Sequence, residues 1–148
     1  LGDVYKRQRF GRALPPELKD LWPLIDAHCA PTLTPGRGVI ARATGATSMT
    51  DNSDGLVPDL GLMARRSGVR IDLDQAAIGP DPLLASAGAV LDVDPWEWVL
   101  GGGEDHTLIG TIEGSAPVGF RSIGAVTKKQ GVRIDGSAPA TDTGWESF

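Results

Sequence analysis

The stretch MTDNSDGL (residues 49–56) places two carboxylates and a hydroxyl within four residues. Asp51 and Asp54 flank Ser53, between a predicted strand and a helix predicted to start at Gly55. Ser53 or Asp54 could be the N-cap of that helix, because both accept hydrogen bonds from helical amides. A cap needs only one side chain, whereas proteins often hold Mg²⁺ through one or two carboxylates together with substrate phosphates. Two interpretations stay open: a capped helix, and a magnesium–phosphate junction at a helix N-terminus.

A second candidate is LGGGEDHTLIG (residues 100–110), in which three glycines precede two acidic residues and a predicted strand. Glycine lets the backbone adopt conformations and close approaches that other residues resist. Glu104 and Asp105 are either solvated acids in a flexible helix-to-strand turn, or side chains that bind a polar or cationic part of a ligand. His106, the next residue, is expected to belong to the strand.

The chain ends in GWESF (residues 144–148), which carries two aromatic side chains. Trp145 and Phe148 either pack onto the core or form a stacking wall for an aromatic or cationic ring. The nearby stretch RIDGSAP (residues 133–139) predicts a hairpin turn and not a site.

The periodicity of apolar residues predicts the elements that must position these side chains. Helices are expected over residues 15–30 (interrupted by Pro23), 36–45, 55–67, 82–91 and 94–100, and strands over residues 46–50, 69–74, 106–114, 120–127 and 131–136. Strand 46–50 is expected to be buried. Helices and strands alternate early and strands cluster late, which favours an α/β (α+β layered) domain with a mixed β-sheet covered by helices.

The composition is that of a globular protein of 148 residues with a net charge of −5. An excess of acidic residues argues against general nucleic-acid binding, which requires Lys and Arg for the phosphates. No apolar run approaches the ~20 residues of a membrane span. The one cysteine cannot form an internal disulfide, so a reducing, cytoplasmic location is expected. The sequence has no GxxxxGK[ST] phosphate loop, so any use of ATP must proceed without one.

The first eight residues, LGDVYKRQ, have neither an initiating methionine nor periodicity, and we expect residues 1–8 to be a non-native leader. Residues 9–36 are expected to form a helix and a Pro/Gly-rich linker, and residues 37–148 the main domain. On this interpretation the chain is truncated at its front.

The ordered set ATSMTDNSDGLVPDLG, SGVRIDLD, LGGGEDHTLIG, IGAVTKKQGVRIDG and GWESF resembles the C-terminal half of the thiamine-monophosphate kinases. The resemblance covers residues 33–148. It implies the C-terminal domain of the aminoimidazole-ribonucleotide-synthetase-like fold, with residues 9–36 coming from an N-terminal domain that is missing. The implied reaction is ATP-dependent phosphorylation of thiamine monophosphate to thiamine diphosphate, with Mg²⁺ ions as the chief catalysts.

The resemblance also implies residue roles. Asp51 and Asp54 would bind Mg²⁺, and Ser53 would touch an ATP phosphate. Glu104 and Trp145 would contact thiamine monophosphate. Asp105 is a further candidate for that contact, and no catalytic base is named. The resemblance further implies a homodimer for the full-length enzyme, and we expect this chain alone to be inactive.

The sequence departs from the family pattern beside two of the motifs. Thr50 and Asn52 stand where the pattern has aliphatic residues, and Thr107 stands where it has glutamate. The polar residues Thr50 and Asn52, on either side of Asp51, are expected to loosen the strand that presents it. Two other functions stay open: another ATP-using enzyme of the same superfamily, and a non-catalytic ligand-binding module.

Overall fold

The computed structural model describes residues 16–139 and divides the chain into two compact units, Leu1–Thr32 and Leu33–Phe148. In the first unit, the 3₁₀-helix η1 (Pro16–Leu21) leads into α2 (Trp22–Cys29). Pro23 lies in the first turn of α2, where an N–H has no helical partner, so it begins this helix instead of interrupting one. The expected leader, residues 1–8, lies outside the described residues.

The second unit contains the motifs. Its elements are α3 (Arg37–Ala43), β1 (Ala46–Asp51), α4 (Leu56–Ser67), β2 (Arg70–Leu73), α5 (Gln75–Ile78), α6 (Pro82–Leu91), α7 (Pro95–Gly101), β3 (Leu108–Ile112), β4 (Gly124–Thr127) and β5 (Gly131–Ile134). Each predicted element of this unit is present within a few residues. The short helix α5 was not predicted; it follows β2 directly because Asp74 accepts a hydrogen bond from the N–H of Ala77 as its N-cap.

The strands form two sheets. β1 and β3 pair antiparallel, and the second sheet has the order β4-β2-β5. Within it, β2 is antiparallel to β4 and parallel to β5, which confirms the predicted mixed sheet. The division into two sheets was not visible in the sequence, because strand pairing depends on contacts between residues far apart along the chain.

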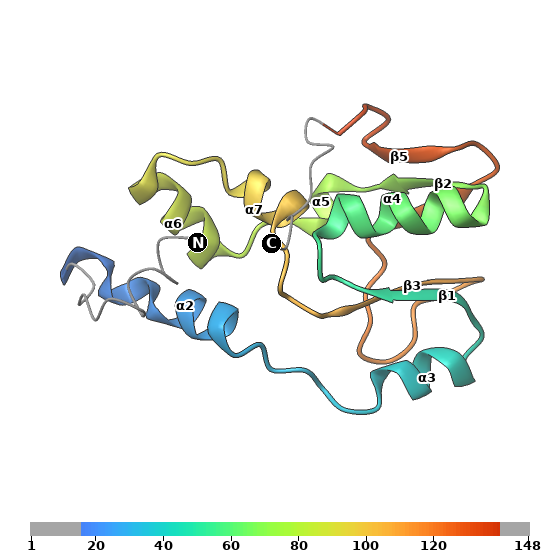
Figure 1. The fold of residues 1–148 in the computed structure, drawn as a ribbon, viewed down its shortest axis with the longest axis horizontal. Coiled ribbons are helices and arrows are strands. Elements are labelled where there is room, and N and C mark those ends of the chain that lie inside the picture. The colour runs from blue at the N-terminus through green and yellow to red at the C-terminus, as the bar shows by residue number, and fades with distance from the viewer. Residues whose placement is uncertain (1–15, 140–148) are drawn as a thin grey trace. The chain divides into compact units, whose positions relative to one another are not determined.

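Helix α4 lies at the centre of this unit, beside β2 in Figure 1, and contacts β1, β2, β5 and α7. It thereby joins the two sheets. One apolar face of the helix supplies half of the core. The buried core residues are Leu56, Leu60, Met63, Ala64, Ile71, Leu73, Ile78 and Val132. Gly68 follows the helix in a left-handed conformation and ends it, which agrees with the helix predicted over residues 55–67.

Strand β1 differs from its prediction as a buried strand. Its residues alternate between half-buried and exposed along the strand. A two-stranded sheet with one face on the core has this pattern, since successive side chains point to opposite faces.

Among the described residues, every helix falls short of the length and apolarity that a bilayer crossing demands.

The core makes a testable prediction about α4. Leu60 is 2% exposed and Leu62 is 40% exposed on the same helix. Leu60→Ala should lower the free energy of unfolding by about 2–5 kcal/mol, because it removes buried methyl groups and leaves a cavity. Leu62→Ala is the matched control and should have little effect. Urea unfolding followed by circular dichroism measures both, and equal losses in the two variants would contradict this core.

Candidate functional site

The pairing of β1 with β3 brings the two sequence motifs together. Asp51, the last residue of β1, lies opposite Leu108, the first residue of β3. The pairing continues past both strands through three main-chain hydrogen bonds: Asn52 N–H to Thr107 O at 2.9 Å, His106 N–H to Asn52 O at 3.0 Å, and Glu104 N–H to Ser53 O at 2.9 Å. The polar residues beside Asp51 therefore do not loosen the strand, because their backbone stays in the ladder. We call residues 51–54 the DNSD turn and residues 101–107 the acidic loop.

Glycines allow this close approach. A Cβ on Gly103 would overlap the carbonyl oxygen of Ser53. Gly55 has φ +125°, and a Cβ there would lie 2.9 Å from the carbonyl oxygen of Gly101. The glycines at these positions are thus required for the contact between the two segments.

The N-terminus of α4 is capped differently from the prediction. Gly55 is the N-cap residue, and neither Ser53 nor Asp54 caps the helix with its side chain. The buried carboxylate of Asp59, in the first turn of the helix, instead holds the backbone that leads into it: its Oδ2 accepts from the N–H groups of Asp54 at 3.0 Å and of Gly55 at 3.2 Å. The sequence held a signal for this role, since an acidic residue in the first helical turn stabilises the positive helix end.

The hydrogen bonds of Asp59 limit which backbone donors at the start of α4 a ligand can use. Because Asp59 already occupies the amides of Asp54 and Gly55, an anionic phosphate cannot use those two donors. The side chains of Ser53 and Asp54 take no part in these hydrogen bonds. The interpretation of Ser53 or Asp54 as the N-cap is therefore wrong, because Gly55 holds that position.

Three ionisable side chains meet where the DNSD turn faces the acidic loop. His106 Nδ1 lies 3.4 Å from Asp51 Oδ2, and its Nε2 lies 3.4 Å from Glu104 Oε2. The hydrogen bond to Asp51 raises the pKa of His106 from its usual value, Glu104 raises it further, and partial burial opposes both. The place thus favours positive charge. His106 itself precedes β3 and has φ 55°, so it is not the strand residue that the sequence predicted.

A buried amide also joins the two segments. Asn52 Nδ2 donates to Asp105 Oδ2 at 3.1 Å, and Thr107 Oγ1 donates to the same oxygen at 2.9 Å. Asn52 is 8% exposed, and its Oδ1 has no hydrogen-bond partner among the described residues. An unpaired buried acceptor costs about 1–3 kcal/mol. The sequence marked Asn52 only as a departure from the family pattern and did not predict this contact, because its partner lies 53 residues further along the chain.

The oxygen donors of the DNSD turn fit a magnesium ion. Asp51 and Asp54 are exposed and Ser53 is half-buried, so their hard oxygen ligands are accessible. In the part of the chain that the structure describes, no three His, Cys, Asp or Glu side chains form a metal cage by themselves. The residues that could hold Mg²⁺ here are Asp51 and Asp54, and a metal held by only one or two carboxylates is commonly completed by substrate phosphate oxygens.

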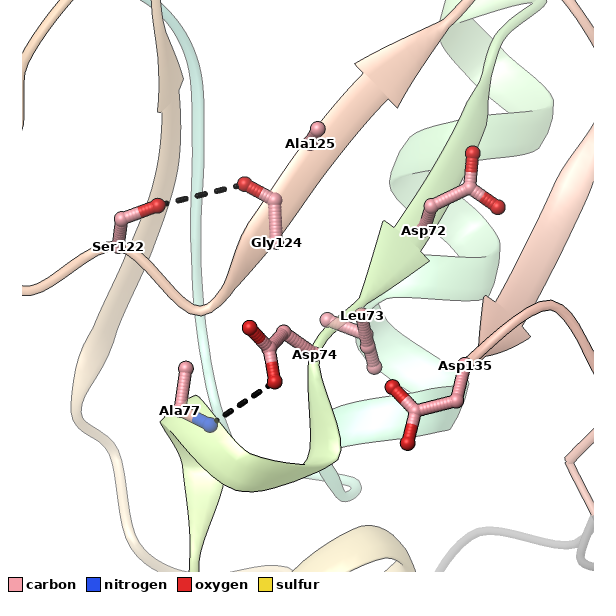
Figure 2. A pocket seen from close by; sticks show the side chains of 8 residues that line it. All are labelled: Asp72, Leu73, Asp74, Ala77, Ser122, Gly124, Ala125 and Asp135. Carbon is pink, nitrogen blue, oxygen red and sulfur yellow. Dashed lines mark hydrogen bonds between the residues drawn. The ribbon is translucent and has the colours of Figure 1, made fainter.

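A second acidic hollow lies at the end of β2, with a volume of about 400 Å³ (Figure 2). Its carboxylates already have structural partners. Asp72 bonds Arg70, which is the main cause of its lowered pKa, while Asp74 caps α5 and Asp135 accepts from the N–H of Gln75. These contacts account for the acidic residues there as parts of the fold.

Two predictions concern the end of the chain. The RIDGSAP stretch forms the predicted tight turn, in which Ile134 pairs with Ser137 and Asp135 and Gly136 have positive φ. Trp145, the predicted stacking residue, lies outside the described residues.

The curated relatives of this chain share one description, thiamine-monophosphate kinase. The Corynebacterium glutamicum protein is 58% identical over 144 residues, which is 95% of this chain and 43% of that protein. The Mycobacterium tuberculosis protein is 44% identical over 133 residues, which is 88% of this chain and 40% of that protein. No protein-family model matches. The chain spans less than half the length of these relatives.

Solved structures share the fold. AaThiL complexed with AMPPCP and TMP is 27% identical with a TM-score of 0.73, and the match covers 98% of this chain and 47% of that one. A thiamine-monophosphate kinase from Stenotrophomonas maltophilia is 24% identical with a TM-score of 0.69, covering 92% of this chain and 46% of that one. The chain thus has the α/β fold of the C-terminal domain of the aminoimidazole-ribonucleotide-synthetase-like superfamily. Within that superfamily it belongs to the thiamine-monophosphate kinase family.

The contact between the segments predicts the effect of a single methyl group. Gly103→Ala should lower stability, because its Cβ cannot coexist with the Ser53 carbonyl unless the hydrogen bond from Glu104 breaks. Gly61→Ala is the matched control: its Cβ would meet only Arg65 Nη1 at 3.6 Å, and alanine favours the helix by about 0.5–1 kcal/mol. Thermal unfolding should therefore show a lower Tm for Gly103→Ala and an unchanged or higher Tm for Gly61→Ala. A Gly103→Ala protein with the wild-type Tm would contradict the close approach.

Proposed function

We propose that this chain supplies part of the active site of an enzyme that phosphorylates thiamine monophosphate. In that reaction a phosphate oxygen of thiamine monophosphate bonds to the γ-phosphorus of ATP, and the bond to the leaving ADP breaks. The observation that carries the proposal is the hydrogen-bonded junction of the DNSD turn with the acidic loop, in a chain 58% identical to a thiamine-monophosphate kinase. Its structural relative AaThiL was solved with AMPPCP, an ATP analogue, and TMP.

The DNSD turn would handle the phosphates of ATP. Asp51 and Asp54 would hold Mg²⁺, and the Ser53 hydroxyl would donate to a phosphate oxygen. Bound Mg²⁺ would neutralise charge on the transferring phosphoryl group. The position of the carboxylates supports this assignment, because Asp51 and Glu104 both lie beside the His106 ring and carry negative charge that a cation would offset. Positioning and charge neutralisation suffice for such a transfer, so no base is assigned.

The acidic loop would contact thiamine monophosphate. Glu104 is the better candidate within the loop, because its carboxylate is 51% exposed and bonded only to the exposed His106 ring in the described structure. The Asp105 carboxylate already accepts from Asn52 and Thr107. We therefore propose a structural role for Asp105 and no contact with the ligand. Trp145 would add a stacking surface for the thiamine rings.

The activity is proposed for a protein of the relatives' length and not for this chain alone. We propose that residues 37–148 form the C-terminal domain and that residues 9–36 connect it to the remaining ligands of Mg²⁺ and ATP. We also propose a homodimer for that protein and a cytoplasmic location, the latter because a single cysteine suits a reducing compartment.

A chimera tests the proposal directly. The matched part of the Corynebacterium glutamicum relative is replaced by this chain, and thiamine diphosphate formation is followed with Mg·ATP and thiamine monophosphate. The chimera should be active, and Asp54→Ala should lower kcat by about 100-fold or more, because it removes charge stabilisation of the transferring group. Asp81→Ala is the matched control, since Asp81 is an exposed aspartate that caps α6 and should leave kcat unchanged.

Two results would contradict the proposal. A wild-type rate in the Asp54→Ala chimera would leave Asp54 without a metal role. A folded chimera that phosphorylates another acceptor but not thiamine monophosphate would place the chain in a sister enzyme of the superfamily.

A further inference from the structure

The buried side chain of Asn52 links the DNSD turn to the acidic loop by a contact that the proposed reaction does not require. Asn52 follows Asp51 directly, and its Nδ2 donates to Asp105 Oδ2 at 3.1 Å. Thr107 Oγ1 donates to the same oxygen at 2.9 Å. One carboxylate oxygen therefore receives a hydrogen bond from each side of the junction.

The orientation of the Asn52 amide is fixed by its partner. A carboxylate oxygen can only accept, so the group that faces Asp105 must be the NH₂. This orientation leaves Asn52 Oδ1 buried without a partner among the described residues. A leucine of similar size would avoid that unpaired acceptor. The amide is costly at this position, and the benefit it brings is the bond to Asp105.

The acidic loop has a conformation that needs such support. Glu104 has φ 66° and His106 has φ 55°. Both lie in the left-handed region of backbone conformation, which residues other than glycine rarely adopt. Two such residues in one short loop persist only where the surroundings hold them. Asn52 supplies that hold at three points: its N–H bonds Thr107 O, its O accepts from His106 N–H, and its side chain bonds Asp105.

We propose that Asn52 is a positioning residue, whose amide holds the strained loop 104–107 so that Glu104 is presented beside the DNSD turn. The side chain itself touches no substrate. It fixes the loop through Asp105, while Glu104 stays accessible. This inference rests on the proposed function for the role of Glu104, but the hold on the loop can be measured without any activity.

Hydrogen–deuterium exchange on the 148-residue chain tests the hold on the loop. Asn52→Leu should raise exchange at the amides of Glu104 and His106 by about tenfold, because a lost hydrogen bond eases local opening. Thr107→Val, at an exposed position, should raise exchange at the same amides by less and keeps the test valid if Asn52→Leu folds poorly. Thr47→Val is the matched control, since it removes a side-chain bond to Thr111 at the far end of the same two strands. It should leave the loop unchanged.

Kinetics of the chimera test the consequence. Asn52→Leu should raise KM for thiamine monophosphate several-fold and leave KM for ATP nearly unchanged, whereas a merely structural role would move both together. Unchanged exchange at the loop in both Asn52→Leu and Thr107→Val, or an equal rise in Thr47→Val, would overturn the positioning role. A wild-type chimera without kinase activity would overturn the proposed function and the role of Glu104, while the exchange result would still decide whether Asn52 holds the loop.

Discussion

The extension of the β1–β3 pairing past Asp51 is the constraint on which the site depends. Without the three main-chain bonds beyond the strands, residues 51–54 and 101–107 would be two separate loops. With those bonds, the carboxylates of Asp51 and Glu104 share one imidazole between them. A short antiparallel ladder thus converts two distant stretches of sequence into one polar surface that favours a cation.

Helix α4 and the core around it support this ladder. Helix α4 contacts both sheets, and Asp59 uses the start of the helix to fix the backbone of Asp54 and Gly55. The carboxylate that stabilises the helix is therefore separate from the carboxylates that remain available to a ligand. Because of this separation, the exposed aspartates do not have to stabilise the start of the helix. It also leaves the N–H groups of Asp54 and Gly55 unavailable to a bound anion.

Local patterns predicted much of this structure. The apolar face of α4, its glycine stop, and the cap that Asp94 provides for α7 all follow from residues within one or two turns of each other. The sequence motifs also named most of the side chains that meet at the junction. Local patterns failed where the decisive partner is distant: Asn52 and Asp105 are 53 residues apart, and strand pairing alone brings them together. The cap was misassigned for a different reason, since Ser53 and Asp54 have favourable residue types but Gly55 occupies the N-cap position.

The position of the metal tests the central claim most directly. Crystals of the chimera, grown with an ATP analogue and thiamine monophosphate, can be soaked with Mn²⁺ in place of Mg²⁺ and measured for anomalous scattering. The account predicts an anomalous peak within about 2.5 Å of a carboxylate oxygen of Asp51 or Asp54, with a phosphate oxygen as a further ligand. Anomalous peaks confined to other parts of the enzyme, with both aspartates free of metal, would contradict it.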